Sequence, residues 1–570
     1  MRFTIQTLGC KVNQYESQAM EQWLTQRGHT EVGPDEAFDL GIVNTCTVTA
    51  VADKKNRNVI RRLRKQCPGA VLAVCGCYAQ VKPEDIRALG ADLISGSGNR
   101  EAFLELALQT LADRRKREAL DEALKRRDFE ILPAGGLSTR TRAMLKIQDG
   151  CNNFCSYCII PYARGPVRSL PLKEAVAQAE KLAAEGYREI VVTGIEIASW
   201  GWDFRDGSRL TRLLDALCAA VPELRVRLGS LEPRIIDREF CETLSGHPNL
   251  CPHFHLSMQS GSDTVLARMR RRYDTARYYE SVALLKEAFP GCAVTTDMIV
   301  GFPGETEAEF AESLAFIRRC GFAAMHVFPY SRRPGTPADQ MPGQLGNALK
   351  EARSAAAIAV AGEMNRAFRE AMIGTVQEVL FEEEATGDAV GGGVLRSEAS
   401  PLGDALRVPT TDEAIGNRQQ ATGDGGNGLP RQCAHWLAMT ESGEAPTVGG
   451  GVLRSEASPL GDAPRVPTTD EASVTSHQSP GDAPVGADAH IGPPASDEAA
   501  GSSPTSSVSR LAGDGGCHLP LKGKALAESL WTGHAPNSIR VYAPGAELHN
   551  QVLSVRITGL YEDGVLGTAE

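Results

Sequence analysis

The stretch MLKIQDGCNNFCSYC, residues 144–158, indicates both the fold and the chemistry of the central part of this chain. It opens with a short β-rich run, and similar runs follow at residues 189–195, 225–231, 253–259, 293–302 and 323–330. Helical patterns, for example at residues 172–185 and 275–288, separate these runs. Six strand–helix units in series predict a partial parallel (βα)6 barrel, whose chemistry lies at the carboxyl ends of its strands.

Cys151, Cys155 and Cys158 (the barrel triad) directly follow the first of these strands. Three thiolates this close in sequence can bind three irons of one four-iron cluster and leave the fourth iron open to a cofactor. A zinc knuckle is the simpler alternative, but zinc requires a fourth ligand close by and none is obvious. We therefore predict an iron–sulfur centre at the mouth of the barrel.

Residues 3–111 contain another series of alternating strands and helices, which predicts an open parallel α/β sheet with crossover helices. Cys10, Cys46 and Cys77 (the sheet triad) each lie just past one of its strands. Because parallel strands bring their carboxyl ends to one edge, the three thiols can converge there. Scattered cysteines are more often packing residues than ligands, so the spacing alone leaves a second cluster open.

A β-rich module begins at residue 373, breaks off near residue 384 and resumes near residue 531. Its two halves together predict a small antiparallel β-barrel of the OB type. The interruption, residues 385–530, is rich in Gly, Pro, Ser, Thr and Asp, and its segment 390–414 recurs at 448–472 with one difference. This composition predicts a disordered, low-complexity insert.

The net charge of −11 is unevenly distributed. The insert carries 9 Lys and Arg against 18 Asp and Glu, which leaves the rest of the chain nearly neutral. Two basic runs stand out in that remainder, KKNRNVIRRLRK at residues 54–65 and RMRRR at residues 268–272. Each run is equally compatible with a track for a phosphate backbone and with a solvated helix face.

The motif CNNFCSYC at the mouth of a partial barrel resembles the radical S-adenosylmethionine superfamily. The segments TLGCKVNQYES, NTCTVT and GCYAQ resemble the N-terminal domain of the methylthiotransferase family within it. The resemblance implies two 4Fe-4S clusters and S-adenosyl-L-methionine as cofactors. The barrel triad would be the catalytic cluster site that binds S-adenosyl-L-methionine, and the sheet triad would hold an auxiliary cluster that presents the sulfur to be transferred.

The same resemblance implies further contacts with S-adenosyl-L-methionine at later strand ends. The expected cofactor-binding residues are Tyr157, Thr193, Gly194, Glu196, Ser257, Gln259 and Asp297. Ser257, Gln259 and Asp297, each taken alone, could equally cap a helix or complete a turn. Cys75 lies inside an apolar run, and the remaining cysteines have no partner spacing, so we expect them to be structural thiols.

The terminal β module resembles the TRAM domain, an RNA-binding barrel of tRNA-modifying enzymes, which implies a tRNA anticodon loop as partner. The forms TLGCKVNQYES, ADKKNRNVIRR, CNNFCSYCIIPYARG and PYSRRPGTPA most resemble the branch that adds a methylthio group to C2 of N6-threonylcarbamoyladenosine next to the anticodon. One departure is Leu170, where this family would be expected to carry a basic residue. The electron donor and the sulfur source are not identified by the sequence.

Four alternatives stay open. The family also contains branches that act on isopentenyladenosine in tRNA or on an aspartate of a ribosomal protein. An electron carrier with two clusters is disfavoured, because ferredoxins use four cysteines per cluster and each group here has three. An RNA-binding protein that has lost catalysis is the fourth alternative.

The chain has 570 residues, more than the roughly 250–300 that one core supports, so we expect several domains. We expect no membrane span and a cytoplasmic location. The expected segments are an N-terminal methylthiotransferase domain (1–112), a charged linker (113–139), a radical SAM core (140–372), a TRAM-like barrel (373–384 plus 531–570) and the insert (385–530). Within the linker, we expect residues 113–130 to be helical.

Overall fold

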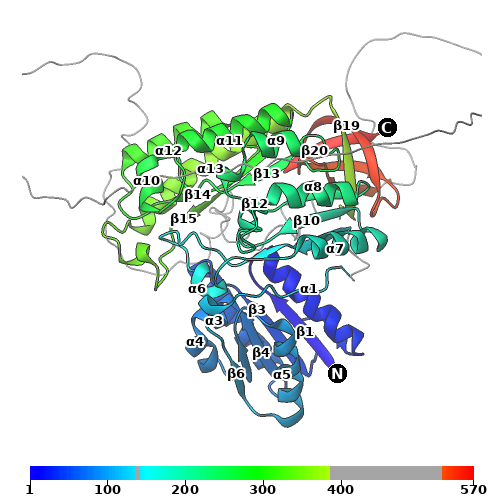
Figure 1. The fold of residues 1–570 in the computed structure, drawn as a ribbon, viewed down its shortest axis with the longest axis vertical. Coiled ribbons are helices and arrows are strands. Elements are labelled where there is room, and N and C mark those ends of the chain that lie inside the picture. The colour runs from blue at the N-terminus through cyan, green and yellow to red at the C-terminus, as the bar shows by residue number, and fades with distance from the viewer. Residues whose placement is uncertain (136–140, 386–528) are drawn as a thin grey trace, which may run out of the picture. The chain divides into compact units, whose positions relative to one another are not determined.

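A computed structural model of the chain describes residues 1–135, 141–385 and 529–570 (Figure 1). The N-terminal part is a six-stranded sheet in the order β2-β1-β3-β4-β5-β6, in which all neighbours run parallel. Its strands are β1 (Arg2–Thr7), β2 (Thr30–Glu31), β3 (Leu40–Thr45), β4 (Val71–Gly76), β5 (Leu93–Ser95) and β6 (Arg117–Ala119). This confirms the open parallel sheet predicted from the sequence.

Helices cover both faces of this sheet, because its central strands are apolar on both sides. The helices are α1 (Lys11–Gln26), α2 (Ala50–Gln66), α3 (Cys77–Val81), α4 (Pro83–Ala88) and α5 (Arg100–Asp113). Side chains of α1 and α5 pack with Phe3 and Ile42 on one face. Those of α2 and α4 pack with Val43 and Val74 on the other.

The expectation of a helical linker after residue 113 is wrong. Residues 117–119 form the edge strand β6, and only a single 3₁₀ turn, η1 (Ala123–Lys125), follows in that charged segment. The charged side chains pair across the sheet edge instead of along a helix, as Arg87 does with Glu118 at 2.9 Å. Charged side chains are common on edge strands, which they protect from pairing with another chain.

The central part is the expected partial barrel, built from two parallel sheets with the orders β11-β10-β7 and β12-β13-β14-β15. Its strands are β7 (Arg142–Lys146), β10 (Glu189–Thr193), β11 (Arg225–Leu228), β12 (Ser230–Leu231), β13 (His253–Leu256), β14 (Ala293–Val300) and β15 (Ala324–Pro329). The main helices are α7 (Leu172–Ala184), α8 (Leu210–Ala220), α9 (Arg238–Leu244), α11 (Thr275–Ala288), α12 (Glu307–Cys320) and α13 (Asn347–Glu370).

Strand β14 illustrates how the barrel separates its two faces. Val294, Met298 and Val300 are buried in the core shared with the helices. Asp297 and Ile299, which alternate with them, are only partly buried. Because side chains alternate across a strand, the second set lines the inside of the barrel, where polar residues are available for a site.

Strands β16 (Val376–Glu384), β17 (Ser529–His534), β18 (Arg540–Gly545), β19 (Val552–Tyr561) and β20 (Gly564–Ala569) close into a barrel in the order β16-β17-β18-β20-β19. This confirms the small β-barrel expected at the end of the chain, with one difference from the antiparallel pairing predicted: β18 and β20 run parallel. The predicted insert, apart from residues 385, 529 and 530, lies outside the described residues. Among the described helices, none has the length and apolar character needed to cross a membrane.

Candidate active site

The sheet triad lies at one edge of the N-terminal sheet. Cys10 precedes α1, Cys46 follows β3, and Cys77 begins α3 directly after β4. Burial raises the pKa of the Cys46 thiol, and the neighbouring Cys77 and Cys10 raise it further. Gly9 permits this close approach: its φ is 121°, and a Cβ there would lie 2.7 Å from the Cβ of Cys46. The structure thus brings together three cysteines that are far apart in sequence.

Arg164 reaches the sheet triad from the barrel part of the chain. It is the last residue of α6 (Ile160–Arg164), and its side chain is fully buried. Its Nε donates to the Sγ of Cys77 at 3.2 Å, and its Nη2 donates to the Oδ1 of Asn13 at 2.7 Å. Its Nη1 pairs with the carboxylate of Glu16. One guanidinium group therefore holds α1 and α3 against the segment that carries the barrel triad.

Arg164 belongs to a buried network with more positive than negative charge. The network consists of Arg100, Lys146, Arg164 and Arg168 with the carboxylates of Glu16 and Asp149. Burial alone would raise the pKa of Glu16, but the surrounding cations outweigh burial and lower it. Four cations against two carboxylates leave an excess of positive charge beside the sheet triad. Because unpaired buried charge is costly, this arrangement favours an anionic group at the cysteines.

The barrel triad lies in the loop between β8 (Gln148–Asp149) and α6. Burial raises the pKa values of Cys151 and Cys158 to about 12. A second arginine contacts this triad, since Nη1 of Arg271 donates to the Sγ of Cys155 at 3.2 Å. Its Nη2 donates to the carbonyl of Ser257 at 3.2 Å, which ties the cysteine loop to the end of β13. Each triad thus has one arginine on one of its sulfurs.

Comparison with known proteins matches each of the two α/β parts of the chain to a family. Residues 145–317 match the radical SAM superfamily, and residues 2–96 match a family described as uncharacterized protein family UPF0004. Threonylcarbamoyladenosine tRNA methylthiotransferase MtaB of Bacillus subtilis is 42% identical over 379 residues, which cover 66% of this chain and 84% of that protein. The chain belongs to the radical SAM methylthiotransferase family.

Other members of this family match over a similar length. MtaB of Thermotoga maritima is 36% identical over 66% of this chain and 86% of its own. A tRNA-2-methylthio-N(6)-dimethylallyladenosine synthase of Maricaulis maris is 34% identical over 73% of this chain and 93% of its own. Among solved structures, the radical S-adenosylmethionine methyltransferase TsrM from Kitasatospora setae matches with a TM-score of 0.46 at 15% identity, over 59% of this chain and 74% of that chain.

Both triads fit the 4Fe-4S clusters that this family implies. Within residues 1–135, 141–385 and 529–570, no three His, Cys, Asp or Glu side chains gather as one metal ion would require. A four-iron cluster has a different requirement, because each cysteine binds a different iron and the sulfurs stay further apart. Soft thiolate donors suit iron–sulfur clusters, and the cationic surroundings suit their negative charge. The donor set therefore agrees with the family.

The expected cofactor-binding residues occupy two neighbouring regions of the barrel. Thr193 ends β10 and Gly194 follows it, and a Cβ at Gly194 would lie 2.9 Å from the carbonyl oxygen of Gln148. Glu196 follows them, and burial, reinforced by Glu232, raises its pKa to about 7. Its charge also contributes to the raised pKa of Cys151. This group therefore lies close to the barrel triad.

The second group of expected cofactor-binding residues consists of Ser257 and Gln259, which follow β13, and Asp297 on β14. The backbone N–H of Gln259, which has a φ of 73°, donates to the carbonyl of Asp297 at 2.9 Å. The carboxylate of Asp297 pairs with His255 at 3.3 Å and with His326 at 3.1 Å. Tyr157 packs edge-on against Phe302, with ring centroids 6.5 Å apart. Contact of these residues, and of Ser257, with a cofactor stays a prediction.

Sequence reasoning missed Arg164, Arg271 and Glu16. Arg164 lies six residues after Cys158 in the same motif-bearing segment, and Arg271 lies inside the basic run 268–272, so both were visible but not distinguished from surface arginines. Leu170, the departure noted in the sequence, is fully buried in the barrel core. Its position in the core leaves no exposed side chain there for a phosphate contact.

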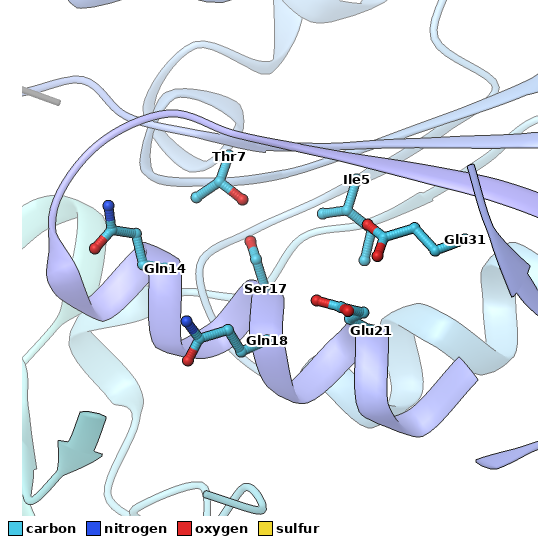
Figure 2. A pocket seen from close by; sticks show the side chains of 7 residues that line it. All are labelled: Ile5, Thr7, Gln14, Ser17, Gln18, Glu21 and Glu31. Carbon is cyan, nitrogen blue, oxygen red and sulfur yellow. The ribbon is translucent and has the colours of Figure 1, made fainter. Parts of the chain in front are cut away.

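A separate polar pocket of about 220 Å³ lies between β1 and α1 (Figure 2). Gln14, Ser17 and Gln18 of α1 face Thr7 of β1 across it. None of the six triad cysteines lines this pocket. We therefore do not include it in the candidate active site.

Proposed function

We propose that this chain is a tRNA methylthiotransferase that adds a methylthio group to C2 of N6-threonylcarbamoyladenosine next to the anticodon. The observation that carries the proposal is the pair of cysteine triads, joined by Arg164, in a chain 42% identical to a threonylcarbamoyladenosine tRNA methylthiotransferase. A methylthio transfer requires two separate functions, generation of a radical and delivery of sulfur. Two cluster sites in one chain provide one site for radical generation and one for sulfur delivery.

The barrel triad would hold the cluster that binds S-adenosyl-L-methionine, and the sheet triad would hold the auxiliary cluster. When bound, such a cluster with S-adenosyl-L-methionine supplies one-electron reductive cleavage of the sulfonium. We also propose that Tyr157, Thr193, Gly194, Glu196, Ser257, Gln259 and Asp297 contact that cofactor. The inward-facing residues of the barrel would orient it and exclude water from it.

Arg164 and Arg271 would serve as positioning residues. Each donates an N–H to a cysteine sulfur at 3.2 Å, and each also bonds to a neighbouring element. A planar guanidinium can make several such bonds in fixed directions, which a lysine cannot. Arg164 lies in the segment that follows the barrel triad and contacts the sheet triad, so it would fix the distance between the two cluster sites. The terminal β-barrel would contribute to binding of the tRNA.

The decisive test is mass spectrometry of tRNA nucleosides from cells with and without this chain. We expect loss of the methylthiolated form of threonylcarbamoyladenosine, and its recovery when the chain, but not the Cys155→Ala variant, is restored. If deletion instead depletes the methylthiolated isopentenyl nucleoside or the modified ribosomal aspartate, the proposed substrate is wrong. If none of the three changes, the proposal of a methylthiotransferase activity is wrong as well.

A further inference from the structure

Helix α2 (Ala50–Gln66) has two faces of opposite character. Its inward face carries Asp53, Asn56, Ile60 and Leu63, all buried. Its outward face is exposed and runs through Val51, Lys54, Lys55, Asn58, Arg61, Arg62 and Lys65. These positions recur at the three- and four-residue spacing of one helix face. Five of the seven outward side chains are basic.

Among the residues that the structure describes, no acidic side chain pairs with the basic side chains of this face. Within the described part of the chain, Lys54, Lys55, Arg61 and Lys65 make no hydrogen bond or ion pair through their side chains. The only acidic residue of the helix, Asp53, points inward and pairs with Arg333 at 3.1 Å. Solvated helix faces elsewhere in the chain mix both signs, as the pair Arg366 and Glu370 on α13 illustrates. An unmixed basic face calls for an anionic partner.

The inward face of α2 holds the candidate active site. Nδ2 of Asn56 donates to the carbonyl of Cys46 at 2.5 Å, and the N–H of Cys46 donates to the Oδ1 of Asn56 at 3.3 Å. At the first turn, the N–H of Ala50 donates to the Oγ of Ser331 at 3.2 Å. Ser331 and Arg333 lie just after β15, at the carboxyl end of a barrel strand. Hydrogen bonds therefore join the helix that carries the basic face to both the sheet triad and the barrel rim.

We propose that the outward face of α2 binds the phosphate backbone of the tRNA stem that adjoins the modified base. This inference rests on the proposed function. A base that enters the site beside Cys46 brings the adjoining backbone to the rim, where α2 begins. From Lys54 to Lys65 the helix extends about 16 Å, enough to follow several consecutive phosphates. Lysine suits this role, because a phosphate backbone requires point charges rather than readout of base edges.

The test compares two variants with the same change of charge. In the first, Lys54, Lys55, Arg61 and Lys65 are each replaced by Gln. In the matched control, four exposed basic residues on the outer side of the barrel are replaced by Gln, namely Lys173, Arg188, Arg212 and Arg238. The probe is a tRNA that carries threonylcarbamoyladenosine, isolated from cells that lack this chain. Full-length reconstituted protein is titrated with it over a range of salt concentrations.

The α2 variant should bind the probe roughly 10- to 100-fold more weakly than wild type. The slope of log K against log salt concentration should fall by about 3, since each lost phosphate contact removes roughly 0.7–0.9 from it. Iron content and the formation of 5′-deoxyadenosine in the absence of RNA should not change. The control variant should bind with the wild-type affinity and slope. Equal losses in both variants would show a general effect of net charge and would overturn the proposal.

Two further outcomes separate this inference from the proposed function. If the wild type binds the tRNA without methylthiolating it, while the α2 variant loses binding, the RNA surface is supported and the proposed reaction is wrong. If the wild type methylthiolates the tRNA and the α2 variant keeps the affinity and slope of the wild type, the RNA surface is wrong and the reaction stands. Binding of the α2 face to an acidic protein instead of RNA would give this second result.

Discussion

Replacing Arg164 with Met should destabilise the protein to a degree that depends on whether the sheet triad holds its cluster. In the cluster-free protein, Glu16 would keep Arg100 at 2.9 Å and Lys146 at 3.1 Å, and Asp149 would keep Lys146 at 2.8 Å. No carboxylate is left unpaired. The loss should therefore be near that of one charged hydrogen bond, about 1.5–3 kcal/mol, and below the ~3–5 kcal/mol of an orphaned buried charge.

In the reconstituted protein the same change removes a further interaction. When the cluster is bound, Cys77 is a thiolate, and the N–H that Arg164 donates to its sulfur is a hydrogen bond between two charged groups. The substitution removes this bond. A bond of this kind adds about another 1.5–3 kcal/mol, which corresponds to a roughly 10- to 100-fold weaker hold on the cluster. Loss of a nearby positive charge also disfavours the reduced, more negative cluster. The reduction potential of the auxiliary cluster should fall.

Three measurements test this. Urea denaturation of the cluster-free and reconstituted proteins gives the two losses of stability, and the rate of iron loss to a chelator reports how tightly the cluster is held. A redox titration in a Cys155→Ala background gives the reduction potential of the auxiliary cluster. Arg168→Met is the matched control, because Arg168 is also buried and pairs with Asp149 at 3.4 Å but hydrogen-bonds to none of the cysteines that the structure describes. It should weaken both forms equally and lower the potential less than Arg164→Met does, because it removes a cation of the same network but no hydrogen bond to a cluster sulfur. The reasoning is refuted if Arg164→Met weakens both forms equally, or matches Arg168→Met in potential and iron loss.

Three other predictions follow from the site and the fold. Cys155→Ala should abolish formation of 5′-deoxyadenosine, whereas Cys77→Ala should preserve it and abolish methylthiolation; product from the second variant in nucleoside analysis would contradict this division. Replacing residues 386–528 by Asn-Gly should preserve folding and activity. The N–H of residue 385 donates to the carbonyl of residue 530 at 2.6 Å, so a short hairpin turn can join the two strands. Loss of the thermal unfolding transition in this variant would contradict the prediction. Asp297→Asn should lower the pKa of His326, because Asp297 raises that pKa through a hydrogen bond. The stability that this pair contributes is present below pH about 6.5 and is lost as pH rises through the raised pKa, so the variant should lack this contribution. An unchanged titration of His326 by NMR would exclude the contact.

The sequence predicted the placement of the six cysteines because that placement depends on topology. Each cysteine follows a strand, and parallel strands bring their carboxyl ends to one edge whatever the details of packing. The same reasoning identified the two α/β parts and the terminal barrel. It did not predict strand β6, since a charged edge strand has no apolar alternation to distinguish it from a solvated helix.

The roles of individual arginines could not be predicted, because they depend on contacts between distant segments. In the run 54–65, Arg57 donates to the hydroxyl of Tyr78 at 2.8 Å and Arg64 pairs with Asp92 at 2.6 Å, while Lys54 and Lys65 face outward. All four side chains are basic and lie in the same run, so the sequence does not distinguish the two groups. The two groups differ in which face of the helix they occupy, and that face is set by how the helix packs on the sheet. The inward cations make structural contacts, and the outward ones are those proposed to bind RNA.

The position of Arg164 suggests why one segment carries both the barrel triad and the contact to the sheet triad. A reaction that needs two cluster sites at one substrate is sensitive to the distance between them, since small displacements of reacting groups strongly reduce rates. Five residues separate Cys158 from Arg164, and most of them lie in the short helix α6. The spacing within this segment is therefore fixed locally. Because its far end bonds to Cys77, the same segment also fixes the second site.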